Sequence, residues 1–330
     1  MRFGIVGTSG HAHRVAAPAL EGCPDAALLG ASGSTPEGGA RFAGQHGLPR
    51  AYRTLDELLG DADVEAVWVC SPNHLHAGHI AKCAAAGKHV LIEKPLATSR
   101  MDAEAAARAA AAAGVTLRVG CQHRFRPSHQ RIREMVRERT IGQIGFARIH
   151  RFWGYPYFED MDPAGPPDWR RSPAASGGWI INDIGSHLLD LMLWMCDSDA
   201  TVAGAVLASQ KFDVQTEDST AVLLQLGEKG IGVVETSCAN ESPGSRIELY
   251  GSRGWLRADD TLSGAATITT HAGESRTYAP MAMLDSYLAE VADFIGAARG
   301  RPGVGADARA GIAVAAIIES AVAMGRTPCR

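Results

Sequence analysis

The chain has no arrangement of cysteines that points to disulfide bonds or a zinc site. Its seven cysteines are odd in number, widely spaced and mostly embedded in apolar runs, which is typical of free thiols in a reducing compartment. No apolar run approaches the roughly 20 residues that a membrane-spanning helix needs. The first residues, MRFGIVG, begin a strand pattern without a charged leader or an apolar segment before a cleavage site. We therefore expect a cytoplasmic protein that is not inserted in a membrane.

The sequence also lacks a large excess of either charge. Its 32 lysines and arginines against 36 aspartates and glutamates leave a formal net charge of -4. Arginines cluster only at residues 124–139, where Glu134 and Glu138 are interspersed, a pattern typical of the solvated face of a helix. Nucleic acid is therefore not an expected partner.

Two sequence patterns divide the 330 residues. Up to about residue 120, short apolar or β-branched runs alternate with alanine-rich helical stretches, which predicts a doubly wound parallel sheet. Alternating strands with turn signals at residues 201–277 predict an antiparallel sheet. We predict an α/β fold with two domains: residues 1–122 hold the parallel sheet, and residues 123–330 form an α+β domain with a large, mainly antiparallel open sheet. The expected parallel strands are residues 3–6, 27–31, 66–70, 89–92 and 116–119.

A glycine-rich turn follows the first predicted strand and precedes a helix. In this context backbone N–H groups and a helix N-terminus bind the pyrophosphate of a dinucleotide, which makes residues 1–122 a candidate Rossmann domain for NAD(P). Compared with G-x-G-x-x-A, the turn has Ser9 in place of the second glycine, so a close backbone approach depends on Gly10. A turn that binds nothing is the alternative. The residues of the turn are Gly7, Thr8, Ser9, Gly10, His11 and Ala12.

The end of the second predicted strand has no carboxylate. Ser32, Gly33 and Ser34 stand where an acidic residue would bind the ribose 2'-OH of NAD. Small hydroxyl residues leave room for a 2'-phosphate, and Arg41 on the following helix could supply positive charge. The sequence favours NADP(H), with NAD(H) as the alternative.

Three further motifs carry groups that suit catalysis. The segment Ser71-Pro72-Asn73-His74-Leu75-His76 and the segment Glu93-Lys94-Pro95 follow the strands at residues 66–70 and 89–92, and open α/β sheets bind ligands at such strand ends. Asp183 and His187 are four residues apart at a helix start, so they share one face. Each residue also has an ordinary interpretation: a solvated lysine, a capping aspartate and a packed histidine.

Together, the glycine turn, SPNHLH, EKP and D-x-G-x-H resemble the Gfo/Idh/MocA family of glucose-fructose oxidoreductase and inositol dehydrogenase-like enzymes, along the full chain. The serine-containing end of the second strand is nearest the NADP-dependent sugar reductases such as 1,5-anhydro-fructose reductase. The resemblance implies hydride transfer between a nicotinamide cofactor and a sugar, a cyclic polyol or a sugar derivative. The same fold also serves glycosidases that use bound NAD transiently, and dinucleotide sensors without turnover, so both remain alternatives.

The resemblance implies that Lys94, Asp183 and His187 form the catalytic group. His187, with an ordinary pKa of about 6.5, would transfer the proton at the substrate oxygen. Lys94 would stabilise the developing alkoxide, and Asp183 would orient the substrate and counter the charge of Lys94. The cofactor contacts expected beyond the glycine turn are Ser32, Gly33, Ser34, Arg41, Ser71, Pro72, Asn73, His76, Glu93, Lys94 and Gln122. The substrate contacts expected beyond the catalytic group are His123, Arg124, Trp153, Tyr155 and Arg170.

Neither pair of nearby histidines predicts a metal site. His11 with His13 and His74 with His76 are not joined by a cysteine or carboxylate triad, and both pairs lie in expected cofactor loops.

The antiparallel sheet should have one face that helices leave uncovered, and an apolar face of this kind must be buried. We therefore expect a homodimer or homotetramer that forms through the C-terminal sheet. The sequence does not decide whether the bond before Pro95 is cis.

Overall fold

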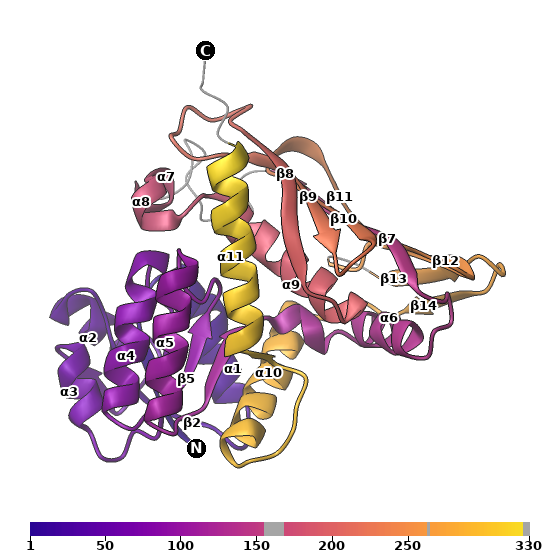
Figure 1. The fold of residues 1–330 in the computed structure, drawn as a ribbon. Helices are drawn as coiled ribbons and strands as arrows, with labels where there is room; N and C mark the ends of the chain where they lie inside the picture. Colours follow the sequence, from indigo (N-terminus) through magenta and orange to yellow (C-terminus); the bar gives the residue numbers. More distant parts are fainter. Residues whose placement is uncertain (155–167, 263–264, 326–330) are drawn as a thin grey trace. The chain divides into compact units, whose positions relative to one another are not determined.

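The computed structural model describes residues 1–154, 168–262 and 265–325. The chain forms two compact units, drawn in Figure 1. The first comprises Met1–Phe125 and Ala282–Ile312, and the second comprises Arg126–Met281 and the chain from Ala313 onward. The expected boundary after residue 122 lies three residues before the observed one. The expected domains also differ from the units in one segment, because residues 282–312 were assigned to the second domain and belong to the first unit.

The first unit is built on a sheet with the strand order β15-β6-β5-β4-β1-β2-β3. Strands β1 to β6 are parallel, and β15 (Ala306–Asp307) pairs antiparallel with β6. The parallel strands are β1 (Arg2–Val6), β2 (Ala27–Ser32), β3 (Arg50–Tyr52), β4 (Ala66–Val69), β5 (His89–Glu93) and β6 (Leu117–Gly120). This confirms the predicted parallel sheet, to which the structure adds the short strand β3.

Three helices of this unit begin where the sequence supplies a capping side chain. The hydroxyls of Thr35, Thr54 and Ser99 accept hydrogen bonds from backbone N–H groups in the first turns of α2, α3 and α5. The elements are η1 (Ala12–Ala16), α1 (Ala17–Gly22), α2 (Pro36–Gln45), α3 (Leu55–Gly60), η2 (Asn73–Leu75), α4 (His76–Ala85), α5 (Arg100–Ala112), η3 (Gln122–Phe125) and α10 (Met283–Ala298).

Helix α10 belongs to the first unit because its apolar face completes the core of that unit. Tyr287, Val291, Phe294 and Ile295 are buried in the same cluster as strand β1. The ring of Phe294 lies 5.8 Å from the ring of Phe3, centroid to centroid. Hydrophobic periodicity predicts a helix at this place, but it does not tell which core the helix covers.

The second unit is built on a sheet with the order β14-β13-β12-β11-β7-β10-β9-β8. All neighbouring pairs are antiparallel except β7 and β10, so the predicted, mainly antiparallel sheet is confirmed. The strands are β7 (Ile144–Gly154), β8 (Ala200–Ala208), β9 (Ser219–Leu226), β10 (Gly230–Ser237), β11 (Ala239–Gly251), β12 (Gly254–Asp259), β13 (Ala266–Thr270) and β14 (Ser275–Tyr278). The helical segments are α6 (Pro127–Arg137), α7 (Asp168–Arg171), α8 (Pro173–Ser176), η4 (Ile181–Gly185) and α9 (Ser186–Cys196).

The two faces of this sheet differ in exposure. A side chain at Gly232 would meet Met192 of α9, so this helix packs closely on one face. The other face carries exposed apolar side chains on adjacent strands, among them Leu223 and Ile231. The expectation of one uncovered apolar face therefore holds for these strands.

Helix α11 (Ala308–Gly325) is long and apolar enough to cross a membrane, by length and composition alone. It has 18 residues with a mean hydropathy of 1.5, and 39% of them are buried. A buried core helix meets the same criteria, and a side chain at Gly311 would collide with Leu96 and Val119. The sequence predicts a helix at residues 306–324, but the statement that no apolar run approaches the length of a membrane span does not hold for it.

Candidate active site

The glycine turn after β1 brings the carboxyl ends of three strands together. Gly7 has φ +92, and a Cβ there would lie 2.7 Å from the carbonyl oxygen of Cys70, so only glycine fits. The N–H group of Gly7 donates to the carbonyl oxygen of Ser32 at 2.9 Å. The chain then enters η1, a π-helical turn of the kind that recurs at functional sites. This backbone cradle fits the pyrophosphate of a dinucleotide, as the sequence predicts.

The turn after β2 presents only some of its expected contacts. The side chain of Ser32 is 2% exposed, whereas Ser34 and Arg41 are exposed. A Cβ at Gly33 would lie 2.8 Å from the hydroxyl oxygen of Thr8, so the glycine turn and the β2 turn are in close contact. Ser34, rather than the buried Ser32, is therefore the serine whose side chain is accessible to a ligand.

His76 does not face a ligand, although we expected it to contact the cofactor. Its ring is fully buried, with Nδ1 2.7 Å from the carbonyl oxygen of Pro95 and Nε2 2.8 Å from that of Ser71. Burial lowers the pKa of His76, although both carbonyl contacts oppose this. The neutral ring donates to one carbonyl, and only the imidazolium donates to both. His76 therefore ties the β4 turn to the turn that carries Lys94.

Glu93 is a buried carboxylate that links two turns. Its Oε1 accepts a hydrogen bond from the Trp68 indole at 3.1 Å, and Nε2 of His11 lies 3.0 Å away, outside hydrogen-bonding geometry. Burial raises the pKa of Glu93, but the contact with His11, the charge of Lys94 and the hydrogen bond from Trp68 together outweigh burial and lower it. A Cβ at Gly120 would lie 3.1 Å from the same carboxylate, so the glycine at the end of β6 leaves room for Glu93. Glu93 therefore connects the glycine turn to Lys94. We had expected both Glu93 and Lys94 to contact the cofactor.

Lys94 is half-buried and is joined to Pro95 by a cis peptide bond. It follows β5 directly, so it lies at the same sheet edge as the turns after β1 and β4. Gln122 is 5% exposed in η3, which follows β6 at this edge. Its neighbour Arg124 is also buried and donates to the carbonyl oxygen of Val304 at 3.3 Å. Arg124 therefore contacts another segment of the first unit. We had expected it to belong to the second domain and to contact the substrate.

The turns after β4 and β6 supply the remaining expected contacts of this unit. Asn73 is 7% exposed, and the hydroxyl of Ser71 lies 2.9 Å from Nδ1 of His79. His123 is half-buried in η3. Ser71 and Pro72 are half-buried in the turn that follows β4, which leaves them partly accessible at the ligand edge.

Asp183 and His187 lie on the helical segment of the second unit, as predicted. Both are half-buried while their neighbours Ile184, Gly185 and Ser186 are buried, so the two side chains share the accessible side of η4 and α9. The sequence spacing thus predicted their common face correctly.

Arg170, an expected substrate contact, pairs with Asp183. Its Nε lies 2.8 Å from Oδ2 of Asp183, and its guanidinium stacks on Trp169 at 4.3 Å from the ring centroid. Arg170 and Asp183 therefore form one polar unit. Tyr155, another expected substrate contact, lies outside the described residues.

Glu217 is a buried residue that the sequence analysis missed. Its carboxylate accepts the Ile181 N–H at 3.0 Å and its carbonyl oxygen accepts the Ile180 N–H at 3.3 Å, which fixes the start of η4. Gly178 has φ +120, and a Cβ there would lie 3.2 Å from the same carboxylate, which explains the glycine. Burial is the main cause that raises the pKa of Glu217 to about 7, and the charge of Asp183 adds to it. No sequence motif marks Glu217, because its importance comes from burial.

Both histidine pairs lie within the described residues 1–154, 168–262 and 265–325. No group of three or more His, Cys, Asp or Glu side chains in these ranges is arranged to hold a metal ion. His11 is paired with Glu93, and His76 bonds backbone carbonyls, so neither histidine pair forms a cluster of ligands.

Two family models match the chain. The oxidoreductase family with an NAD-binding Rossmann fold, Gfo/Idh/MocA, matches residues 1–121, and its C-terminal domain matches residues 129–257. The myo-inositol 2-dehydrogenase of Thermotoga maritima is 30% identical over 305 residues, which cover 89% of this chain and 87% of the relative. The chain belongs to the Gfo/Idh/MocA family. The resemblance inferred from the sequence motifs is confirmed.

Other relatives of this Gfo/Idh/MocA protein span nearly its whole length. The inositol 2-dehydrogenase of Rhizobium meliloti is 28% identical and covers 98% of this chain and 96% of its own, and the 1,5-anhydro-D-fructose reductase of Ensifer adhaerens is 28% identical over 91% and 88%. The structure of GenD2 from gentamicin A biosynthesis, in complex with NAD, has a TM-score of 0.82 at 26% identity, over 98% and 93% of the two chains. The protein is an NAD(P)-dependent dehydrogenase or reductase.

Proposed function

We propose that the protein transfers a hydride between NADP(H) and a hydroxyl-bearing or carbonyl carbon of a sugar, a cyclic polyol or a sugar derivative. The observation that carries the proposal is the edge of the first sheet, where the Gly7 cradle follows β1 and the buried Glu93 carboxylate and Lys94 stand at the end of β5, on the two sides of β4. Relatives named as inositol and sugar dehydrogenases or reductases support the substrate class.

The proposed chemistry gives each catalytic side chain one task. The nicotinamide ring supplies or accepts the hydride, and a proton must move at the substrate oxygen in the same reaction. His187 moves that proton, because a histidine titrates near neutral pH. Lys94 donates a hydrogen bond to the oxygen and stabilises developing negative charge. Asp183, held by Arg170, orients the substrate hydroxyls.

The preference for NADP(H) over NAD(H) is supported by the turn after β2. Ser34 and Arg41 are exposed there, and the hydroxyl of Thr35 already accepts the N–H of Gly38 at the start of α2. A hydroxyl and a guanidinium can bind a 2'-phosphate, whereas NAD binding ordinarily uses a carboxylate at the end of this strand.

A fluorescence titration tests the cofactor. NADPH and NADH are titrated side by side into the wild type and into Arg41→Ala, and we expect NADPH to bind more tightly and the variant to lose about tenfold in NADPH affinity with NADH unchanged. Equal weakening of both cofactors would assign Arg41 a structural role. Tight binding with no hydride exchange across a panel of sugars and polyols would indicate a sensor, and glycoside cleavage without net cofactor reduction would indicate a glycosidase.

We also propose that the protein assembles as a homodimer or homotetramer through the sheet of the second unit. Val206, Leu223, Ile231 and Tyr250 are 59%, 44%, 42% and 44% exposed on one face. Phe146 lies in register between Ile231 and Tyr250, so apolar side chains line three adjacent strands. A contiguous apolar area of this kind marks an interaction surface. Light scattering should give twice or four times the chain mass, and a monomer would refute the assembly.

A further inference from the structure

A row of buried polar side chains crosses the sheet of the second unit beside η4. Arg151 on β7 is in register with Thr236 on β10, which is in register with Thr220 on β9. These three side chains are 7%, 1% and 7% exposed. Thr236 marks the face of the sheet, because a Cβ at Gly185 would lie 3.7 Å from its Cγ2. The row therefore lies directly beneath the segment that carries Asp183 and His187.

The hydrogen-bonding groups of this row are left without protein partners. Within the part of the chain that the structure describes, Nη1 of Arg151 and the hydroxyl oxygens of Thr236 and Thr220 have no hydrogen-bond partner. Adjacent strands are about 4.8 Å apart, so the two threonines are one strand spacing apart and the long side chain of Arg151 begins one strand further along. Buried polar groups are satisfied in nearly all proteins, so an unsatisfied row requires an explanation.

The guanidinium of Arg151 is held in a fixed orientation. It stacks on the ring of Trp153, with Cζ 3.9 Å from the ring centroid. Stacking uses the face of the guanidinium and leaves the N–H groups at its edge available to donate. The stacked arginine is thus prepared to bind a planar acceptor.

Arg151 itself forms no ion pair with a described side chain. Burial, together with the smaller effect of the positive charge of Arg126, lowers the pKa of Arg151 to about 10. Arg126 is itself 6% exposed. Arg151 stays charged at neutral pH, and a buried cation without a counter-charge is costly. An anion at this position would remove that cost and bond the free donors.

We propose that Arg151, with the hydroxyls of Thr236 and Thr220, binds a carboxylate of the substrate. The substrate is then an acidic sugar or polyol, such as a uronate or an aldonate, and this inference rests on the function proposed above. A carboxylate matches the planar guanidinium and has lone pairs left for the two hydroxyls. Placed beside Gly185, the carboxylate would anchor the substrate next to Asp183 and His187.

The test compares acidic ligands with neutral ones of the same skeleton. D-glucuronate and D-gluconate are titrated against D-glucose and D-glucitol, with the protein saturated with NADPH and cofactor fluorescence as the readout. We expect the acids to bind about 10- to 100-fold more tightly. Arg151→Met should remove this preference and leave NADPH binding unchanged. Arg257→Met, which removes an exposed arginine of the same sheet paired with Asp259, should retain it.

The outcomes separate this inference from the proposed function. If neutral ligands bind as tightly as acids, or if Arg151→Met keeps the preference, the inference is wrong while hydride transfer can still be measured. If no nicotinamide cofactor binds, the proposed function itself fails. Should Arg151→Met not fold, Thr236→Val removes one hydroxyl at nearly constant volume, and it should weaken the acids several-fold without affecting neutral ligands. Unchanged affinity for the acids in Thr236→Val would also overturn the inference.

Discussion

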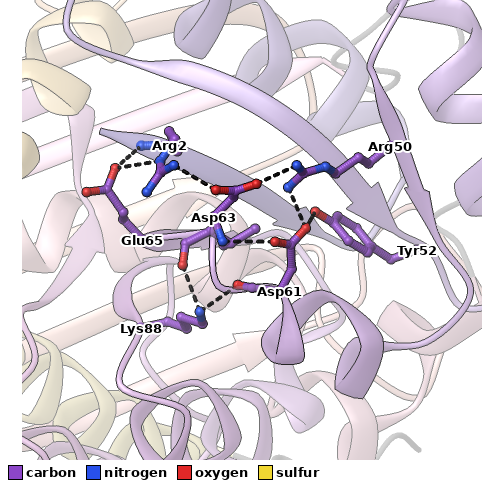
Figure 2. A network of polar contacts seen from close by, with 8 residues as sticks. Arg2, Arg50, Tyr52, Asp61, Asp63, Glu65 and Lys88 are labelled. Carbon is purple, nitrogen blue, oxygen red and sulfur yellow. Dashed lines mark hydrogen bonds and ion pairs between the residues drawn. The ribbon is translucent and has the colours of Figure 1, made fainter.

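The two ends of the sheet in the first unit both carry many charges, but they use them differently. At the amino ends of the strands, Arg2, Arg50, Asp61, Asp63 and Glu65 form a network of ion pairs, shown in Figure 2. The side chains of Arg2 and Asp63 are 45% and 48% exposed. At the carboxyl ends, Glu93 is buried and its neighbour Lys94 is half-buried. The same sheet thus has a solvated charged end and a buried charged end.

The difference shows that burial, rather than the number of charges, distinguishes the end suited to chemistry. In the exposed network each guanidinium already faces carboxylates, and water and salt screen the pairs. A surface hollow beside Arg50, Tyr52 and Asp61 therefore holds no charge that needs a ligand. Around Glu93 the same kinds of groups interact at lower dielectric, where each charge acts more strongly on its neighbours.

The largest effect should follow removal of the Lys94 charge at the carboxyl ends of the strands. Lys94→Ala should lower kcat by about 10²- to 10³-fold, because the developing alkoxide loses a preorganised donor. Cofactor affinity should stay within a factor of about two, since the pyrophosphate cradle is backbone. Steady-state kinetics and NADPH titration measure the two quantities. An active Lys94→Ala enzyme would remove Lys94 from the mechanism.

The buried carboxylate of Glu217, in the second unit, should make the stability of the protein depend on pH. Burial raises the pKa of Glu217 from 4.5 to about 7, so its favourable contribution is complete below pH 4.5 and is lost as the pH rises through 7. As the pH rises from 4.5 to 7, the unfolding free energy of the wild type should fall by about 3 kcal/mol relative to that of Glu217→Gln. Urea denaturation at pH 5 and pH 8 measures the change. The exposed control Glu134→Gln should differ from the wild type by almost the same unfolding free energy at both pH values. If the difference between the wild type and Glu217→Gln also did not change with pH, the role of burial would be refuted.

His76 tests whether the buried end is also held together by its polar groups. His76→Ala removes the ring N–H that bonds the carbonyl oxygen of Ser71 or Pro95 and opens a cavity, which should cost about 2–4 kcal/mol of unfolding free energy. His76→Gln, which keeps a donor, should restore part of the loss. A fully stable His76→Ala would mean that the two turns do not depend on this ring.

The smallest effect should come from the exposed network. Arg50→Met breaks its contacts with Asp61 and Asp63, and its effect on the unfolding midpoint should be smaller than that of His76→Ala. The effect should shrink further in high salt, because these side chains are screened. A large, salt-independent loss would show that the amino end is as strongly coupled as the carboxyl end, and the comparison would fail.

The motifs allowed much of this to be predicted from the sequence. Gly7, Lys94, Asp183 and His187 are short-range signals whose positions follow from strand ends and helix spacing. Long-range packing was not predictable in the same way. The sequence does not show that α10 joins the first core.

The roles of individual buried groups were the least predictable part of the site. Ser32 and His76 were read as cofactor contacts because their motifs adjoin the cofactor turns, but both side chains are buried in the structure. Glu217 was missed because no motif surrounds it. Its role comes from contacts with Gly178 and with Ile181, which lies 36 residues earlier in the chain. Burial depends on contacts between distant segments, and no local pattern encodes it.

The central claim is that the protein transfers hydride with Lys94 at the reacting oxygen. The most direct test incubates the wild type and Lys94→Ala in parallel with NADP⁺ and a panel of neutral and acidic sugars and polyols, and records the absorbance of reduced nicotinamide. We predict that NADPH forms in the wild type with at least one class of substrate and that the variant is slower by two or more orders of magnitude. Equal rates in the two proteins, or no reduction of either NADP⁺ or NAD⁺ by any compound, would contradict the account.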